Sequence, residues 1–476
     1  MIRFISTSGA RIEEVPWVAP QNVFSHIHHL AGALWLDSQT QNTYGTWSVI
    51  AYSPSKLISA NVDDEPIVTL RTSLSAHPNP WVDLPSEISQ LIPPFLGGMA
   101  GVFGYELGRA LEDVKTNGPL IVNGKTIPDL CIGLYPSVLS FNHSQQRCFI
   151  VATGIGSTER NQRQTADTQI EQWRALLDLP AGDVKSPSQV AHIESNFSRD
   201  EYMEAVANVI DLIRDGEIFQ ANISQCYTGQ LMSHDDGFGR YLKMRQINPA
   251  SFGGFFRGDN WSLASNSPER LIALAGDKVN ARPIKGTVPR STNPIEDNRF
   301  VQKLLASDKD KAENIMIVDL LRNDLARVCH DFSIDVPELC VLESHAHVHH
   351  LVSTITGTLT RDNSAIDLLS ACFPGGSITG APKIRAMDII AQIEQRPRGP
   401  YCGSLGYIGF NGHMDMNILI RSIVQSGSEF VFNVGGGITA QSNPADEYQE
   451  TLDKAAGVFQ AIGVNASQIQ TTTLSA

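Results

Sequence analysis

The sequence predicts a mixed α/β or α+β protein built on large sheets. The first 175 residues are strand-rich and are repeatedly broken by turns. Beyond residue 196, strand-like runs and long amphipathic helices are mixed along the chain, which is the pattern of helices packed on sheets. With 476 residues, the chain is long enough for two or three ordinary domains or for one large assembly with a sizeable core.

A polar stretch rich in Pro, Gly and Ser, "DLPAGDVKSPSQVAHIESN", interrupts the more periodic segments and is typical of a linker. It sets the predicted division of the chain. The parts are an N-terminal region over 1–178, a linker over 179–196, a second region over 197–462 and a C-terminal tail over 463–476.

The first helix of the second region has clear start and stop signals. Ser198 and Glu201 form a capping box, and Gly216 follows the last apolar position of the helical pattern. Further helices are predicted at about 308–328, from Pro382 onwards, and at about 446–462.

Strand-like runs rich in β-branched and apolar residues lie between these helices. They are predicted over 217–228, 261–265, 270–275 and 278–288. The last two are joined near Gly276 and Asp277, which indicates a hairpin.

Composition excludes several classes of function. A formal net charge of −14 argues against sequence-independent binding of nucleic acid, which depends on Lys and Arg. No apolar run approaches the roughly 20 residues that span a bilayer, and the N-terminus lacks a signal-peptide pattern. Seven scattered cysteines without a C-x-x-C pair predict reduced core residues rather than disulfides. A cytoplasmic protein without a membrane role is expected.

One lysine stands inside a predicted strand, in "RPIKGT" at 282–287. Period-two alternation puts Lys285 on the same face as Ala281 and Pro283. Burial lowers the pKa of a lysine and can supply a neutral amine nucleophile. The alternative is that Lys285 reaches solvent or pairs with a distant carboxylate.

Two predicted helices carry acidic pairs three residues apart, Asp310 with Glu313 and Glu447 with Glu450. Residues at this spacing share a helix face. One carboxylate from each helix, with water and an anionic ligand, is a usual way to hold Mg²⁺. Solvated helix faces are the alternative.

Two glycine-rich loops, 373–383 and 433–440, are each expected before a helix, where free N–H groups can bind carboxylate or phosphate. Neither fits a nucleotide-binding pattern, and plain turns are the alternative.

Histidines alternate along a further predicted strand. His345, His347 and His349 would share one side and His350 the other, a pattern that could bind zinc. A partly exposed strand decorated by histidines is the favoured interpretation.

Together these segments resemble the chorismate-utilising enzymes, a family that includes anthranilate synthase component I, isochorismate and salicylate synthases, and aminodeoxychorismate synthase component I. The resemblance is carried in order by "SPERL", "RPIKGT", "KDKAENIMIVDLLRND", "VHHLVSTI", "FPGGSITGAPKIRAM", "YCGSLGY" and "YQETLDKA". It extends more loosely to "LWLDS" and "GGMAGVFGYELGR" near the N-terminus. It implies an anthranilate synthase component I-like fold, in which large sheets form a β-sandwich core flanked by helices.

Two positions indicate the branch of the family. Anthranilate synthases typically have alanine in "PIAGT", whereas "PIKGT" with Lys285 is similar to the aminodeoxychorismate synthase branch. Isochorismate and salicylate synthases use a water-activating lysine on an earlier strand, and the corresponding position here is Gln220.

The resemblance implies a chemistry. Neutral Lys285 adds at C2 of chorismate while Glu269 protonates the departing C4 hydroxyl, and ammonia then enters at C4 and expels the lysine. Glu313 and Glu450 are implied to hold Mg²⁺ against the ring carboxylate. No glutaminase motif is found, so ammonia is expected from solution or from a separate glutamine amidotransferase subunit. Further contacts to the substrate are implied for His350, Ser377, Tyr401, Arg421 and the backbone of Gly435, Gly436 and Gly437.

In relatives the N-terminal sheet region binds tryptophan. The implied pocket here consists of Ser38, Tyr44, Gly45, Thr46, Trp47, Ser251, Phe252 and Gly253. Ser251 replaces a proline that is common in the family, and the usual "LLES" is absent, so the sequence leaves regulation by tryptophan open. The rival functions are an anthranilate synthase component I and a non-catalytic tryptophan-binding regulator.

Overall fold

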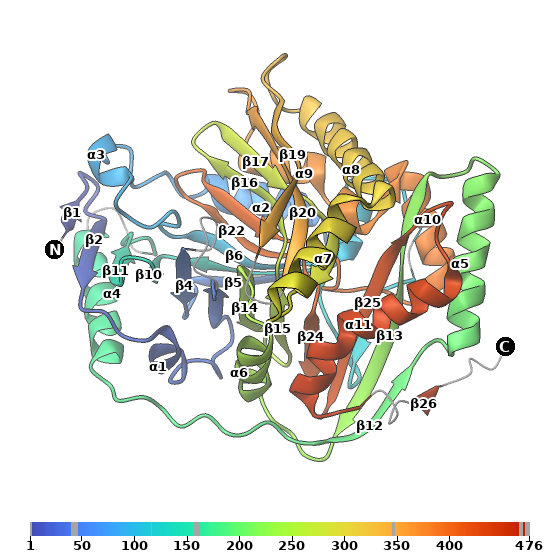
Figure 1. Ribbon diagram of the computed structural model, residues 1–476. Helices are drawn as coiled ribbons and strands as arrows, with labels where there is room; N and C mark the ends of the chain where they lie inside the picture. Colours follow the sequence, from blue (N-terminus) through green and yellow to red (C-terminus); the bar gives the residue numbers. More distant parts are fainter. Residues whose placement is uncertain are drawn as a thin grey trace.

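The computed structural model describes residues 2–39, 46–115, 117–156, 162–344, 348–465 and 470–471. Two large sheets dominate this part of the chain, and helices cover their outer faces (Figure 1). The predicted sandwich of large sheets flanked by helices is confirmed.

The larger sheet has fourteen described strands, and neighbours along its path are hydrogen-bonded. Their order is β1 (Arg3–Ile5), β2 (Arg11–Val15), β11 (Arg147–Ala152), β10 (Ser137–Asn142), β4 (Trp47–Ala51), β3 (Leu34–Asp37), β14 (Phe252–Arg257), β15 (Ser262–Ser267), β24 (Ser422–Ser426), β25 (Glu429–Ile438), β13 (Gln220–Leu231), β12 (Val190–Ser195) and β26 (Gln470–Thr471), with β21 (Gly380–Ala381) beside β13.

The smaller sheet has ten described strands. Their order is β18 (Ile284–Pro289), β20 (Val348–Thr358), β17 (Lys278–Arg282), β16 (Arg270–Ala275), β23 (Met414–Asn417), β22 (Ser404–Gly409), β6 (Gly98–Phe103), β9 (Leu130–Tyr135) and β5 (Lys56–Ala60), with β19 (Asp335–Ser344) beside β20. A separate ribbon consists of β7 (Ile121–Val122) and β8 (Lys125–Thr126).

The described helices are short to medium in length. They are α1 (Pro20–Phe24), α2 (Pro66–Ser75), α3 (Ser86–Ser89), α4 (Gln162–Leu177), α5 (Arg199–Arg214), α6 (Phe238–Ile247), α7 (Pro294–Leu305), α8 (Asp308–Ala326), α9 (Ala365–Cys372), α10 (Lys383–Glu394) and α11 (Pro444–Ile462), with 3₁₀ turns η1 (Val62–Asp64), η2 (Tyr105–Ala110) and η4 (Gly376–Ile378). Within the described ranges, no helix is long and apolar enough to cross a bilayer.

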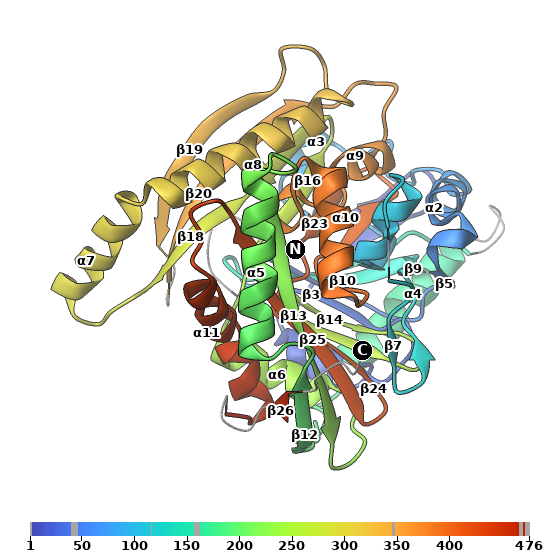
Figure 2. The same cartoon turned by 90° about the vertical axis from the view of Figure 1, so that its right-hand side faces the viewer.

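The inner faces of the two sheets form one apolar layer. Val49 and Leu263 from the larger sheet share a buried cluster with Val102 and Leu405 from the smaller one. Outside, α4, α6 and α11 pack on the larger sheet, and α8 and α9 pack on the smaller sheet. Figure 2 shows α5 and α10 in front of β13, where a further apolar cluster joins them to that strand. This layering buries the apolar faces of these helices against the sheets.

Most predicted elements of the second region are present within a few residues. The capping box that starts α5 is formed: Ser198 Oγ accepts the Glu201 N–H at 3.2 Å, and the Glu201 carboxylate accepts the Ser198 N–H at 2.7 Å. The hairpin at Gly276 and Asp277 joins β16 to β17. The single strand predicted over 278–288 is wrong, because the chain breaks into β17 and β18 at Pro283, whose nitrogen carries no hydrogen to donate to a neighbouring strand.

Two further expectations need correction. Residues 190–195 of the predicted linker form β12, which pairs with β13. The glycines predicted in a loop at 433–440 instead end strand β25, where Gly435, Gly436 and Gly437 lie opposite residues of β13. Both regions separated by the predicted linker contribute strands to both large sheets.

Candidate active site

Lys285 lies on β18, at the edge strand of the smaller sheet, and its side chain is half-buried. Its Nζ donates a hydrogen bond to the Ser377 carbonyl at 3.1 Å. Gly286 follows with φ of +78° at a break in the pairing register between β18 and β20. The predicted residue therefore faces the turn η4, and its acceptor there is a neutral carbonyl.

Glu269 lies in the short connection between β15 and β16 and is buried. Its Oε1 accepts the Ile284 N–H at 3.3 Å, one residue before Lys285. Burial raises the pKa of Glu269, and the nearby Lys285 opposes that rise. A carboxyl group with a raised pKa can retain its proton near neutral pH, as a general acid must.

Arg421 is held next to this carboxyl in a left-handed conformation, with φ of 55°. Such a conformation costs a non-glycine residue about 1–3 kcal/mol and is concentrated at functional sites. Burial lowers the pKa of Arg421, while Glu269 acts in the opposite direction. The guanidinium therefore remains a cation beside the candidate acid.

The two predicted acidic helices converge. Glu313 on α8 and Glu447 on α11 share Lys309, whose Nζ lies 3.9 Å from Glu313 Oε1 and 2.9 Å from Glu447 Oε1. Glu450, also on α11 and more exposed, pairs with Lys454 Nζ at 2.6 Å. The carboxylates are thus grouped around two ammonium groups.

Lys285 acts electrostatically on this cluster as well. Burial raises the pKa of Glu313, and Lys285 and Lys309 oppose the rise. Burial would also raise the pKa of Glu450, but Lys454, Lys309 and Lys285 together lower it. The predicted nucleophile, acid and metal ligands therefore belong to one site.

The donor set fits Mg²⁺ in chemical type. Carboxylate oxygens from two helices are the hard ligands that this ion prefers, and two lysine ammonium groups stand as cations among them. Across the described ranges, no three His, Cys, Asp or Glu side chains are arranged to hold a metal by themselves. Glu313 and Glu450 are the residues that would hold such an ion, with water and a bound anion as its other ligands.

The glycine strand forms one wall of this site. A Cβ on Gly436 would lie 3.3 Å from both Glu447 Oε2 and Glu450 Oε1. A Cβ on Gly437 would lie 2.4 Å from the Gln220 amide nitrogen and 3.5 Å from Lys285 Nζ. Glycine is required here for space, since a side chain would fill the region in front of the amine.

Other predicted substrate residues lie around this centre. His350 is buried on β20, and its Nδ1 is 2.8 Å from Thr287 Oγ1 on β18. Ser377 is buried on η4, next to Glu269. Tyr401 is also buried, and its ring lies 5.7 Å from the Arg398 guanidinium carbon.

The zinc pattern of alternating histidines falls partly outside the described residues, since these exclude His345 and His347. His349 is buried, with Nε2 3.1 Å from Asp297 Oδ1 and Nδ1 2.8 Å from Ser344 Oγ. Its two ring nitrogens are thus occupied by protein groups.

Sequence reasoning missed several charged residues of the site. Lys309 and Lys454 stand four residues from Glu313 and Glu450 respectively, and this spacing is a signal that could have identified them. Arg398 likewise stands four residues after Glu394, its ion-pair partner, whereas its other acceptors come from distant elements.

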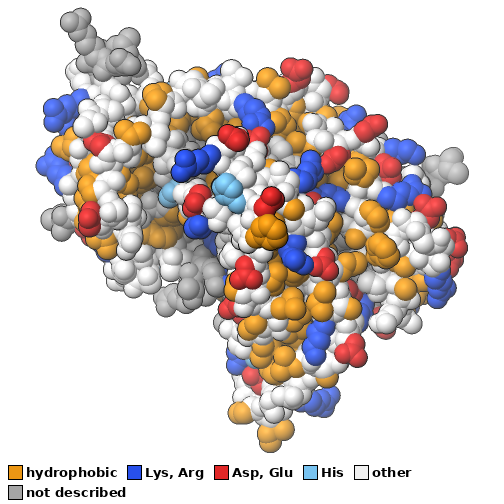
Figure 3. All heavy atoms as spheres, turned by 90° about the horizontal axis from the view of Figure 1, so that it is seen from above, with side chains coloured by type: hydrophobic (Ala, Val, Ile, Leu, Met, Phe, Trp, Pro, Cys, Tyr) orange, Lys and Arg blue, Asp and Glu red, His pale blue; other side chains and the backbone are white. Residues whose placement is uncertain are grey.

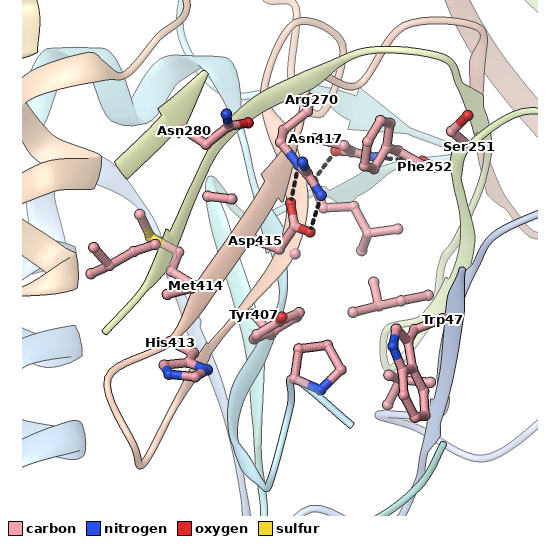
Figure 4. Close-up of a pocket in the computed structure, with 18 of the residues that line it drawn as sticks. Trp47, Ser251, Phe252, Arg270, Asn280, Tyr407, His413, Met414, Asp415 and Asn417 are labelled. Atoms are coloured by element: carbon pink, nitrogen blue, oxygen red, sulfur yellow. Dashed lines mark hydrogen bonds and ion pairs between the residues drawn. The ribbon is translucent and has the colours of Figure 1, made fainter. Parts of the chain in front are cut away.

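A second cavity of about 440 Å³ lies between the two sheets (Figure 4). Thr46, Trp47, Ser251, Phe252 and Gly253 of the predicted tryptophan pocket line it. Tyr44 and Gly45 lie outside the described residues. Ser38 is not among the lining residues, and its N–H donates to Ser48 Oγ at 2.9 Å.

Polar residues that the sequence did not single out also line this cavity. Arg270 and Asp415 form a two-point ion pair at 2.9 and 2.8 Å, with the Arg270 guanidinium over the Phe252 ring. Asp37 accepts hydrogen bonds from Arg245 at 2.6 Å and from the Tyr241 hydroxyl at 2.8 Å. The cavity therefore combines apolar walls with carboxylates that are already paired.

Comparison with known proteins gives consistent results. A family model described as chorismate binding enzyme matches residues 31–460. Aminodeoxychorismate synthase component 1 of Salmonella typhimurium is 36% identical, covering 94% of this chain and 98% of that protein. Anthranilate synthase component 1 of Thermus thermophilus is also 36% identical, covering 79% and 80%. The crystal structure of anthranilate synthase component I from Streptococcus pneumoniae superposes with a TM-score of 0.73 at 26% identity, covering 89% of this chain and 93% of that one.

Proposed function

Because the chain belongs to the chorismate binding enzyme family, we propose that it joins ammonia to C4 of chorismate, releasing water and forming 4-amino-4-deoxychorismate. The relatives named aminodeoxychorismate synthase component 1 support this reaction. The observation that carries it is the Lys285 amine, held against the Ser377 carbonyl and within electrostatic reach of Glu269 and both candidate metal ligands.

The reaction divides into two displacements. Neutral Lys285 forms a bond to C2, both ring double bonds shift, and the C4–oxygen bond breaks as Glu269 gives its proton to the hydroxyl, which leaves as water. Ammonia then bonds to C4, both double bonds shift back, and the C2–nitrogen bond to Lys285 breaks. The surplus proton on the new amine passes to the Glu269 carboxylate, which restores the acid.

Mg²⁺ is part of the proposal. Glu313 and Glu450 would hold it, and when bound it would supply positive charge to the ring carboxylate. This supply is needed because the net charge of −14 does not attract a dicarboxylate. On the face shown in Figure 3, acidic and basic side chains are interspersed rather than gathered by sign.

The chain's own groups would bind the rest of the substrate. The Arg421 cation and the Ser377 and Tyr401 side chains are assigned to carboxylate binding, with His350 close to the ring. The glycine strand Gly435–Gly437 leaves room for the carboxylates to approach the backbone.

The ammonia supply involves a second protein. The name component 1 of the relatives implies a partner component, and we assign to that partner the hydrolysis of glutamine as an amidotransferase. Free ammonium would replace it in the test tube.

The cavity between the sheets is assigned to L-tryptophan. Five of its lining residues belong to the pocket expected from the sequence, and its apolar walls and volume suit an indole side chain. Tryptophan would act there as a ligand outside the reaction centre.

Product analysis tests the proposed reaction. The protein is incubated with chorismate, Mg²⁺ and an ammonium salt, and products are separated with and without an added lyase that releases 4-aminobenzoate. A main product converted to 4-aminobenzoate supports the proposal. Fluorescent anthranilate as the main product would overturn it in favour of C2 amination, and tryptophan binding without turnover would favour a regulatory protein.

A further inference from the structure

Arg398 is buried behind the active-site turn, 2% exposed, and its side-chain hydrogen bonds go to groups without an assigned chemical role. Its Nη1 donates to the Ile378 carbonyl at 2.9 Å, and its Nη2 donates to the Asn222 carbonyl at 2.6 Å. Ile378 follows Ser377, whose carbonyl accepts the Lys285 amine. One side chain therefore ties strand β13 to the turn that holds the candidate nucleophile.

The charge of Arg398 is neutralised within the protein. Glu394, at the end of α10, accepts from Arg398 Nε at 2.9 Å and from Nη2 at 2.7 Å. The same carboxylate accepts the N–H and hydroxyl of Ser224 on β13, at 2.8 and 2.9 Å. These contacts use four of the five N–H groups of the guanidinium, so at most one is left for a substrate.

The position of Arg398 is fixed from its backbone as well. Buried Glu106 on η2 accepts the N–H groups of Arg398 and Gly399 at 2.8 and 2.9 Å. The rings of Tyr105 and Tyr401 lie 4.7 and 5.7 Å from the guanidinium carbon. Both the main chain and the side chain of Arg398 are therefore restrained.

We propose that Arg398 is a positioning residue for Lys285. By holding the Ile378 carbonyl, it fixes the adjoining Ser377 peptide group, and that group holds the Lys285 amine. By holding Asn222, it keeps the turn in register with β13, whose Asn222 N–H also donates to the Thr379 carbonyl at 2.8 Å. Arginine is required because its planar guanidinium donates hydrogen bonds to several acceptors at fixed angles. A lysine ammonium cannot reproduce this geometry. This inference rests on the proposed function of Lys285.

The test compares Arg398→Lys with Arg385→Lys. Arg385 is an exposed residue of α10 that pairs with Glu217 at 3.0 Å. Arg398→Lys is expected to lower kcat for C4 amination about tenfold or more, with KM for chorismate within about threefold of the parent value. The acid limb of the kcat profile of Arg398→Lys against pH should also shift, because the position of the Lys285 amine changes. Arg385→Lys should match the parent.

A second measurement requires no turnover. Competitive reductive methylation, read by peptide mass spectrometry as a function of pH, reports the reactivity of the Lys285 amine itself. Arg398→Lys should change the labelling of Lys285, while exposed Lys303 on α7 keeps its parent rate. If Arg398→Lys does not fold, the same two measurements are made on Glu394→Gln and test the proposal instead. This change removes the negative charge that neutralises the Arg398 guanidinium but keeps the side-chain length.

Each outcome has a defined meaning. Parent-like kcat and parent-like labelling of Lys285 in a folded variant would overturn the positioning role. Equal changes at Lys285 and Lys303 would also overturn it, since they indicate general loosening. Failure of the parent protein to form 4-amino-4-deoxychorismate would instead refute the proposed function.

Discussion

The hydrogen-bond acceptor of Lys285 is a backbone carbonyl. The Nζ group is therefore positioned by the main chain of the turn at Ser377. Glu269, the candidate acid, lies one hydrogen bond from the neighbouring Ile284. The nucleophile and the acid are therefore positioned from the same strand without being paired to each other.

Replacing Lys285 tests the covalent role directly. Lys285→Ala should lose about 99% or more of C4 amination, because nucleophilic catalysis is removed, while the unfolding temperature stays within a few degrees of the parent. Product chromatography measures the loss of C4 amination, and thermal unfolding measures the unfolding temperature. Lys278→Ala, on the exposed surface of the adjoining strand β17, is the matched control. C4 amination by Lys285→Ala at the parent rate would contradict the covalent role.

At the scale of the elements, two helices and one glycine strand build the site. Helices α8 and α11 are separated by more than a hundred residues, yet Lys309 joins them through Glu447. Strand β25 brings its glycines between α11 and Lys285. None of these elements makes a site alone.

The metal assignment of α8 predicts a loss of affinity. Glu313→Gln removes one negative oxygen donor, so binding of Mg²⁺ should weaken about tenfold or more, by analogy with other ligand substitutions. Calorimetric titration with Mg²⁺ in the presence of chorismate measures this affinity for Mg²⁺. Asp319→Asn, on the exposed side of the same helix and paired with Arg322, should titrate like the parent. Identical titration curves for Glu313→Gln and the parent would refute the assignment of Glu313 as a Mg²⁺ ligand.

The glycine strand predicts a steric effect on activity. Gly437→Ala places a methyl group 2.4 Å from the Gln220 amide nitrogen and 3.5 Å from Lys285 Nζ, so the reaction should slow about tenfold or more. Gly457→Ala on α11 meets nothing closer than 3.6 Å and should raise stability by up to about 1 kcal/mol, since alanine favours helix. Steady-state kinetics and urea unfolding compare the two. Full activity in Gly437→Ala would show that the substrate does not need the space between Gly437 and Lys285.

At the scale of the whole molecule, the active site depends on two sheets that draw strands from both ends of the chain. Strand β6 from the N-terminal region pairs with β22 from the C-terminal half, and β3 pairs with β14. Unfolding of the N-terminal strands must therefore disturb the catalytic region. The strands at one edge of the larger sheet, including β2 and β11, belong to the same sheet as β25 of the site.

An ion pair at that edge predicts the acid sensitivity of the molecule. Arg147 on β11 holds the pKa of Glu14 on β2 at about 2, against an ordinary value of 4.5. Because the pKa is lower in the folded state, the contribution to stability is present above about pH 4.5 and is lost as the pH falls toward 2. It is at most about 3.5 kcal/mol, at about 1.4 kcal/mol per pKa unit, and solvent screening of the pair reduces it.

Arg147→Met should accordingly be less stable than the parent at pH 6, and the difference should shrink between about pH 5 and pH 2. Urea unfolding at a series of pH values measures this. Arg214→Met, which removes an exposed pair with Asp211, should show little difference at any pH. A pH-independent gap for Arg147→Met would contradict the assigned pKa of Glu14.

The sequence by itself determined the helices with strong caps and the fold class, and it singled out the residues that the proposed mechanism uses. A capping box or an i,i+3 acidic pair is a local pattern, so it can be identified without knowing the neighbours. The resemblance carried by "PIKGT", "SPERL" and the two glutamate helices then united Lys285, Glu269, Glu313 and Glu450 in one proposed mechanism.

Only the tertiary structure decided how those residues are held. The break at Pro283, the pairing of β12 and the strand character of the glycine run depend on partners far along the chain. Lys309, Lys454 and Arg398 each stand four residues from a glutamate, which the sequence shows. The sequence does not show that Lys309 also reaches Glu447, or that Arg398 also reaches Asn222 and Ile378, because these hydrogen bonds join distant segments. Local spacing specifies which residues share a face, whereas long-range packing specifies what that face meets.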